Sequence, residues 1–373
     1  MTHVVIAADK FKGSLTAQQV GAAIETGLRR TRPAIGIRRV PIADGGDGTL
    51  EALSGYGFSS VDVVAAGPTG LPTRTRYLRS GPLAVIELAA VSGVLLLPAG
   101  PAPMTATSRG TGELIAAALD AGCRRIVLGV GGSAGTDGGA GMLQAVGAGL
   151  FDADGAEIGS GGAGLTRLVA VDLTGLHPGL AAAEVVLATD VDNPLTGPAG
   201  AAAVYGPQKG TSPDQVAELD EALGRYADLV AAATGRDLRN EPGAGASGGV
   251  GFAAIAVLAA QVRPGIEIVL ELVDFDRVVT GADLVITGEG SLDEQTLAGK
   301  APAGVAAAAR RAGVPVIAVC GRNLLTPAQI SRAGFAAVHS LGELEPDPAR
   351  SMARAGQLLE RVAERIGAGL RRA

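Results

Sequence analysis

Residues 125–141 read RIVLGVGGSAGTDGGAG, an apolar, β-branched run that passes directly into a glycine-rich loop. An apolar, helix-like segment follows from residue 142 to residue 150. Glycine lets the backbone bend sharply and approach a ligand closely, and free backbone N–H groups at a strand-to-helix turn attract anions. This stretch therefore predicts a strand whose end holds a phosphate, with the acid Asp137 available to a metal ion.

The same order of strand, loop and helix recurs along the 373 residues. Strands are expected at 3–8, 38–43, 61–64, 74–78, 83–88, 125–130, 184–188, 283–287, 314–319 and 335–338. Helices are expected after Thr16, which can cap the first of them, and at 113–121, 213–234 and 347–370. Repeated alternation of this kind predicts an α/β protein with a largely parallel sheet.

Composition excludes several other classes of protein. The net charge is −6, and no stretch is rich enough in Lys or Arg to indicate a nucleic-acid surface. The two longest uncharged runs, 88–108 and 242–262, are interrupted by prolines or begin in a glycine-rich loop, so neither predicts a membrane span. The first residues lack the basic leader of a signal peptide. With only Cys123 and Cys320, a reducing cytoplasm is the simpler expectation.

Charged and amide side chains gather in loops that follow predicted strands, which is where open α/β sheets bind their ligands. These loops cover residues 9–14, 44–48, 133–139, 190–193 and 289–300. Their acids suit Mg²⁺, and their lysines suit phosphate. A single Asp after a strand more often only caps a turn, Ser14 could simply begin a helix, and Arg109 could be a solvated side chain rather than a carboxylate clamp.

Two other motif matches compete with this interpretation. Residues 129–134 fit the G-x-G-x-x-A variant of the dinucleotide fingerprint. Residues 131–135 and 245–249 each fit G-x-S-x-G, the hydrolase nucleophile elbow, and His339 follows both. In a chain with 57 glycines such matches arise by chance, and the Walker A sequence is not present.

Taken together, the loops resemble those of the bacterial glycerate kinase family, which includes glycerate 2-kinases. The resemblance is carried, in family order, by residues 9–16, 41–49, 107–113, 129–143, 188–195, 206–210, 243–251, 286–293 and 299–302. Three positions depart from the usual family pattern: Thr136 stands in place of Asn, Arg109 in place of an aromatic residue, and Ala8 in place of Pro. No carboxylate or lysine is lost through these changes.

The resemblance implies phosphorylation of D-glycerate by ATP with Mg²⁺. It also implies two α/β domains with the active site in the cleft between them. Residues 1–75 and 281–373 would form a flavodoxin- or Rossmann-like domain from both chain ends, and residues 76–280 would form an inserted second domain.

We assign roles within this scheme from residue chemistry. Asp190 is the first choice for orienting the attacking hydroxyl and Asp293 the second, while Lys10 acts on the transferred phosphoryl group. Substrate and phosphate binding is expected of Lys12, Ser14, Gly131, Gly132, Ser133, Asn193, Lys300 and Arg109. Mg²⁺ is expected near Asp137, Asp44 or Asp190.

Three functional alternatives stay open at this point. Attack by the 2-hydroxyl gives 2-phosphoglycerate, which we favour, and attack by the 3-hydroxyl gives 3-phosphoglycerate. The substrate could be another small hydroxy acid, or the protein could be a non-catalytic sensor of ATP or glycerate. The sequence leaves open whether the chain forms a homo-oligomer.

Overall fold

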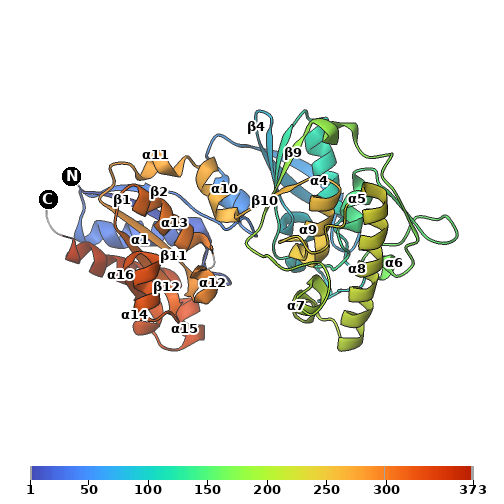
Figure 1. Ribbon diagram of the computed structural model, residues 1–373. Coiled ribbons are helices and arrows are strands. Elements are labelled where there is room, and N and C mark those ends of the chain that lie inside the picture. Colours follow the sequence, from blue (N-terminus) through green and yellow to red (C-terminus); the bar gives the residue numbers. More distant parts are fainter. Residues whose placement is uncertain (1, 298, 371–373) are drawn as a thin grey trace. The chain divides into compact units, whose positions relative to one another are not determined.

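The structure is a computed structural model that describes residues 2–297 and 299–370 (Figure 1). The chain divides into two compact units. Unit 1 comprises Met1–Asp44, Glu51–Tyr56 and Pro264–Ala373, and unit 2 comprises Gly45–Leu50 and Gly57–Arg263. No helix among the described residues combines the length and apolar character needed to cross a membrane.

Unit 1 is built on a five-stranded sheet in the order β13-β12-β11-β1-β2, in which every neighbouring pair is parallel. Its strands are β1 (His3–Ala8), β2 (Gly36–Arg39), β11 (Leu284–Leu292), β12 (Val316–Asn323) and β13 (Phe335–Ser340). Its helices are α1 (Ala17–Thr31), α10 (Gly265–Leu272), α11 (Phe275–Val279), α12 (Glu294–Leu297), α13 (Ala301–Arg311), α14 (Pro327–Ala333), α15 (Pro348–Ala353) and α16 (Ala355–Gly369), with a 3-10 turn at Leu341–Glu343. Helix α2 (Thr49–Leu53) begins in the part of the chain assigned to unit 2 and ends in unit 1.

Helices α1 and α16, which are far apart in the sequence, lie side by side in unit 1 (Figure 1). A Cβ on Gly27 would lie 2.1 Å from the carbonyl oxygen of Glu360, so glycine is what allows the two helices to approach. Val4 and Ile6 of β1 belong to the same buried cluster as side chains of both helices. As expected, Thr16 caps α1 and accepts a hydrogen bond from the Gln19 N–H.

Unit 2 contains a six-stranded sheet in the order β10-β9-β6-β5-β4-β3, parallel from β10 to β5 and antiparallel at β4 and β3. Its strands are β3 (Ser59–Ala66), β4 (Pro72–Ser80), β5 (Leu83–Glu87), β6 (Arg125–Gly129), β9 (Glu184–Ala188) and β10 (Gln261–Arg263), and β7 (Gly149–Phe151) pairs separately with β8 (Ala170–Asp172). Its helices are α3 (Ala89–Ser92), α4 (Arg109–Asp120), α5 (Ala140–Ala145), α6 (Gly162–Leu165), α7 (Ala201–Tyr205), α8 (Pro213–Thr234) and α9 (Ala246–Ala256), and 3-10 turns lie at Val94–Leu96, Pro178–Ala182 and Pro207–Lys209.

These sheets and helices confirm the predicted α/β class, but several details of the sequence prediction were wrong. The strand expected at 38–43 ends at Arg39. The segment 142–150 is not one helix, because α5 ends at Ala145 and Gly147, at φ +101°, turns the chain into β7. Residues 288–292 are not loop, since β11 continues to Leu292 beside β12. The C-terminal helix is interrupted at Arg354.

The bounds of the compact units also differ from the domain boundaries expected at 75 and 280. Strand β3 pairs along its whole length with β4, which in turn pairs with β5, so residues 59–75 belong with the sheet of unit 2. Helices α10 and α11 belong with unit 1.

Candidate active-site groups

Three acids lie near the carboxyl ends of adjacent strands in unit 1, with Glu289 still inside β11 and Asp44 in the segment that follows β2. Ala8 of β1 is in register with Gly288 of β11, so Asp9 and Glu289 each stand one residue beyond this pair. The segment after β2 runs beside β1, with the Ile42 N–H donating to the Ala8 carbonyl at 3.2 Å, and it leads to Asp44. The topology of the parallel sheet thus gathers Asp9, Asp44 and Glu289, which we call the acid cluster.

Electrostatics within the acid cluster disfavour full ionisation. Burial, together with the charge of Asp44, raises the pKa of Asp9 well above its usual value. Burial also raises the pKa of Glu289 to about 7, and the charges of Asp293 and Asp44 add to this increase. A hydrogen bond from Thr296 and the charge of Lys300 act in the opposite direction. A cation placed here would relieve the mutual repulsion of these carboxylates.

The other predicted site residues of unit 1 differ in their exposure and in their hydrogen bonds. Lys10 is partly buried and its backbone N–H donates to Asp9 Oδ1 at 2.6 Å, whereas Lys12 is exposed. Lys300 Nζ donates to Gln295 Oε1 at 3.0 Å. The Ser14 hydroxyl donates to the Met352 carbonyl at 3.2 Å, so it contributes to the packing of α15.

Asp293 serves the local structure. Its Oδ1 accepts the backbone N–H groups of Gln295 at 3.0 Å and Thr296 at 3.3 Å, and its own N–H donates to Thr296 Oγ1. These bonds begin α12, as a capping residue does. The catalytic role assigned to Asp293 therefore stays a prediction.

In unit 2 the glycine-rich loop after β6 has an exposed beginning and a buried remainder. Gly132 is exposed, Gly131 is partly buried and Ser133 is 9% exposed, whereas residues 134–141 are buried. The buried part packs against a second glycine-rich loop, because the Gly138 N–H donates to the Gly248 carbonyl at 2.9 Å. The surface that this loop offers to a phosphate is therefore limited to residues 131–133.

Asp137 organises the interior of this loop. Its Oδ2 accepts hydrogen bonds from the Ser108 N–H at 2.7 Å, the Ser108 hydroxyl at 2.8 Å and the Gly141 N–H at 3.4 Å. Its Oδ1 accepts the Gly139 N–H at 3.0 Å. Both oxygens of this buried carboxylate accept hydrogen bonds that shape the loop, and the metal-binding role expected of Asp137 stays a prediction.

The segment 45–50 lies against the end of β6. Glu87 accepts the backbone N–H groups of Gly48 at 3.1 Å and Leu50 at 3.0 Å. A Cβ on Gly129 would lie 2.1 Å from the Gly45 carbonyl oxygen, and a Cβ on Gly132 would lie 4.0 Å from Asp47 Cβ. Asp47, which is exposed, is thus placed beside the open part of the glycine-rich loop.

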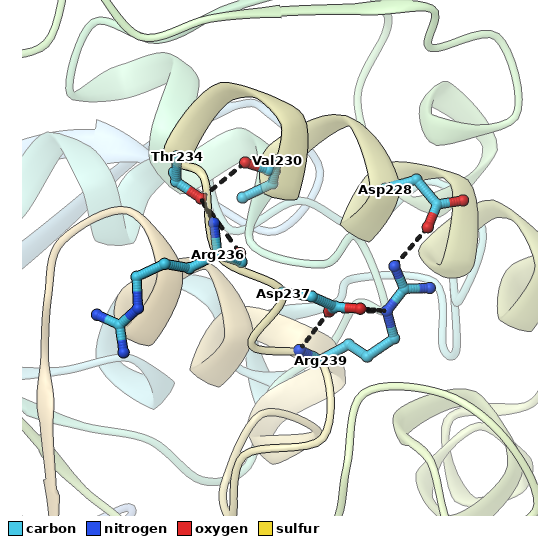
Figure 2. Close-up of polar contacts among 6 residues, drawn as sticks. All are labelled: Asp228, Val230, Thr234, Arg236, Asp237 and Arg239. Carbon is cyan, nitrogen blue, oxygen red and sulfur yellow. Dashed lines mark hydrogen bonds and ion pairs between the residues drawn. The ribbon is translucent and has the colours of Figure 1, made fainter.

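Asp190 is exposed shortly after β9, on a loop held by backbone contacts. The Gly245 N–H donates to the Asn193 carbonyl at 2.8 Å, and the Leu195 N–H donates to the Arg239 carbonyl at 2.8 Å. Figure 2 shows how Arg239 is fixed in turn: its guanidinium pairs with Asp237 at 2.9 Å and also with Asp228 of α8. The end of α8 therefore holds the loop that carries Asp190.

Two side chains that we expected to bind substrate already contact other residues of unit 2. Asn193 Oδ1 accepts from the Tyr205 hydroxyl at 2.6 Å and its Nδ2 donates to the Ala199 carbonyl at 2.9 Å. Arg109 Nε pairs with Glu113 at 3.2 Å on a half-exposed face of α4. Their roles in binding substrate stay predictions.

Sequence reasoning included Asp9, Glu289 and Asp47 in candidate loops but gave them no individual role, and it did not identify Lys209 as a candidate residue. The first two had a signal, since each directly follows a run of buried strand residues. Lys209 is a buried lysine in the 3-10 turn after α7, and nothing in its local pattern indicates burial.

The donor set fits a loosely held Mg²⁺. Within residues 2–297 and 299–370, no three His, Cys, Asp or Glu side chains form a ready metal cage. Mg²⁺ usually keeps several waters and takes only one or two carboxylates together with substrate phosphates. The mutually repelling carboxylates of the acid cluster, centred on Asp44, match that requirement.

The chain is an α/β protein with two main sheets. Its glycine-rich loop and its acid cluster beside lysines have the chemistry that suits phosphate groups and metal ions. The model of the glycerate kinase family matches residues 4–371. The chain is 44% identical to a glycerate kinase of Bacillus subtilis (strain 168), over 99% of this chain and 97% of the relative. It is also 44% identical to a glycerate 2-kinase of Escherichia coli (strain K12), over 91% and 90% of the two chains.

A solved structure has the same architecture. A crystal structure from Salmonella typhimurium LT2, assigned as a glycerate kinase 2, superposes with a TM-score of 0.83 at 43% identity, covering 98% of this chain and 97% of the other. This chain belongs to the glycerate kinase family.

The raised pKa of Glu289 gives a first prediction. A carboxyl group whose pKa rises from 4.5 to about 7 on folding binds more protons when folded, so stability is lost as pH increases through this window. Glu289→Gln keeps an acceptor for Thr296 and removes the charge. We expect it to raise the free energy of unfolding at pH 8 by about 2–3 kcal/mol, and by much less at pH 5.

Urea unfolding at both pH values, in buffer free of divalent cations, measures this difference. Glu294→Gln is the matched control, because Glu294 is an exposed acid of neighbouring α12. An equal gain at pH 5 and pH 8 would contradict the prediction.

Proposed function

We propose that the protein transfers the γ-phosphoryl group of ATP to D-glycerate and that 2-phosphoglycerate is the product. Two relatives that match nearly the whole chain are named glycerate kinase and glycerate 2-kinase, which supports both the substrate and the favoured position of attack. The structural observation that carries the proposal is the acid cluster at the end of a parallel sheet, next to Lys10 and Lys300.

Each unit contributes one group of residues to this reaction. In unit 2, backbone N–H groups of residues 131–133 would bind phosphate oxygens, and Asp190 would orient the attacking hydroxyl and accept its proton. In unit 1, Lys10, Lys12 and Lys300 would neutralise the transferred phosphoryl group and the glycerate carboxylate. That the two groups act around a single substrate stays a prediction.

Mg²⁺, when bound, would neutralise negative charge on the phosphate oxygens. Asp44 is the residue we assign to it, assisted by Asp9 and Glu289. In addition to orienting the hydroxyl, Asp190 would lie near Mg²⁺, as the sequence analysis expects. We place the reaction in the cytoplasm, where the buried free thiols of Cys123 and Cys320 stay reduced.

The test is ³¹P NMR of the purified protein incubated with ATP, Mg²⁺ and D-glycerate. We expect a new phosphomonoester resonance coupled to one proton, as 2-phosphoglycerate requires. Coupling to two protons would instead identify 3-phosphoglycerate. Parallel reactions with L-glycerate, glycolate and lactate test other hydroxy acids. Nucleotide binding without any phosphoester would overturn the kinase proposal in favour of a sensor.

A further inference from the structure

Lysine is rare in this chain, since arginine supplies nearly all of its positive charge. Lysine stands at four positions only, 10, 12, 209 and 300. Three of these already have a role in the proposed reaction. The fourth, Lys209, lies in unit 2 and is 5% exposed.

The Lys209 side chain contacts the buried side of the glycine-rich loop. Its Nζ donates to Ser133 Oγ at 2.7 Å and also to the Gly135 carbonyl. A Cβ on Gly248 would lie 2.9 Å from Nζ, so the second glycine-rich loop, residues 243–251, lies against the ammonium group. Both of its acceptors are neutral, and in the described part of the chain Lys209 forms no ion pair within 4 Å.

A buried ammonium group with neutral partners is destabilising for a protein. Burial lowers the pKa of Lys209 to about 8, and the nearby charge of Asp137 only partly opposes this decrease. The unfavourable free energy of this cation therefore needs a compensating contribution. An anion bound at the exposed residues of the same loop would supply it.

The contact also determines the direction of the Ser133 hydroxyl. Because Ser133 Oγ accepts from an ammonium group, its own proton must be donated elsewhere. Within residues 2–297 and 299–370, this hydroxyl makes no second hydrogen bond. Ser133 stands beside the open residues Gly131 and Gly132, where a ligand oxygen could accept that proton.

We propose that Lys209 is a positioning residue for nucleotide phosphate: it holds Ser133 so that the serine hydroxyl donates to a phosphate oxygen, and it adds positive charge beneath the loop. The inference rests on the proposed function, in which this loop binds ATP. Lys209 itself does not touch the reacting atoms: its positioning effect passes through Ser133, and its charge acts on the phosphate through space.

The test compares Lys209→Met, Ser133→Ala and the double variant with the unmodified protein. Calorimetry measures the Kd of the nonhydrolysable analogue AMP-PNP with Mg²⁺, and steady-state assays measure kcat and the KM of each substrate. We expect each single change to raise the nucleotide Kd about 10- to 100-fold and to leave the KM for D-glycerate unchanged. The nucleotide Kd of the double variant should be no higher than that of the single variant that binds nucleotide more weakly. Both single changes disrupt the same contact between Lys209 and Ser133, so their effects should not add.

Thermal unfolding separates this role from a purely structural one. Lys209→Met removes an unfavourable buried charge, so its Tm should be equal or higher while its nucleotide affinity falls. If Lys209→Met does not fold, Ser133→Ala decides alone, with Ser133→Thr expected to restore binding by restoring the hydroxyl.

Unchanged nucleotide affinity in the folded single variants, or full additivity in the double variant, would overturn the inference. A rise in the KM for D-glycerate without a change for nucleotide would also overturn it, since the loop would then hold the other substrate. If the unmodified protein binds AMP-PNP but phosphorylates no glycerate, the proposed function fails while the comparison of Kd values still decides the role of Lys209.

Discussion

Asp190→Asn should lower kcat by about 10²- to 10⁴-fold, which is the usual contribution of a general base. The amide keeps the size of the side chain and can still accept a hydrogen bond, but it cannot take the proton of the attacking hydroxyl. Asp190 is exposed beyond the end of β9, and the loop around it is fixed through Gly245 and Arg239, so the substitution should not disturb the fold.

Asp192→Asn is the matched control, because it makes the same chemical change at an exposed position of the same loop. The assay is initial rate against both substrates, with nucleotide affinity measured separately. We expect Asp192→Asn to behave like the unmodified protein. Near-full turnover by Asp190→Asn would show that another group takes the proton, and Asp293 would then be the next variant to make.

The second large effect is structural and concerns Gly248→Ala. Gly248 has φ +71°, which side chains rarely adopt, and a Cβ here would lie 2.3 Å from the Gly135 carbonyl oxygen and 2.8 Å from Thr136 Cα. Backbone atoms cannot move aside as the end of a flexible side chain can. We expect a loss of about 3–5 kcal/mol in the free energy of unfolding, the range reserved for mutations with a specific steric or strain mechanism.

Gly224→Ala provides a control for which we expect the opposite change in the free energy of unfolding. Gly224 lies inside α8 without a positive φ, and a Cβ added to it would meet nothing within 4 Å. Alanine there should raise the free energy of unfolding by about 0.5–1 kcal/mol, since it favours helix over glycine. Chemical denaturation of both variants measures the difference, and a loss below about 1 kcal/mol for Gly248→Ala would show that the two loops separate easily.

The order of strands and helices could be predicted because local patterns determine it. Residues 4–8 of β1 are buried, as their uninterrupted apolar character indicates, and α8 has the bounds expected from the sequence, 213–234. Prediction failed where a glycine changed the direction of an apolar segment, as Gly147 does between α5 and β7.

The candidate site could be predicted only in part, because its contacts are distant in sequence. Asp44 was identified from its loop, yet its effect on Asp9 and Glu289 depends on which strands are neighbours. The glycine-rich loop was predicted to bind an anion, but the packing of Gly138 against Gly248 leaves only its first residues exposed. No local pattern connects Lys209 with Ser133, which are 76 residues apart.

The strand order of unit 1 has a consequence for how the chain acquires its structure during synthesis. Strand β1 is made first, but one of its two neighbours is β11, which follows some 280 residues later. At about 5–20 residues per second, the ribosome needs roughly 15–60 s to supply it. Residues 57–263 of unit 2 are continuous and can fold meanwhile. The apolar strand β1 and the apolar face of α1 therefore stay without part of their native packing until the strands and helices of the C-terminal segment have been made.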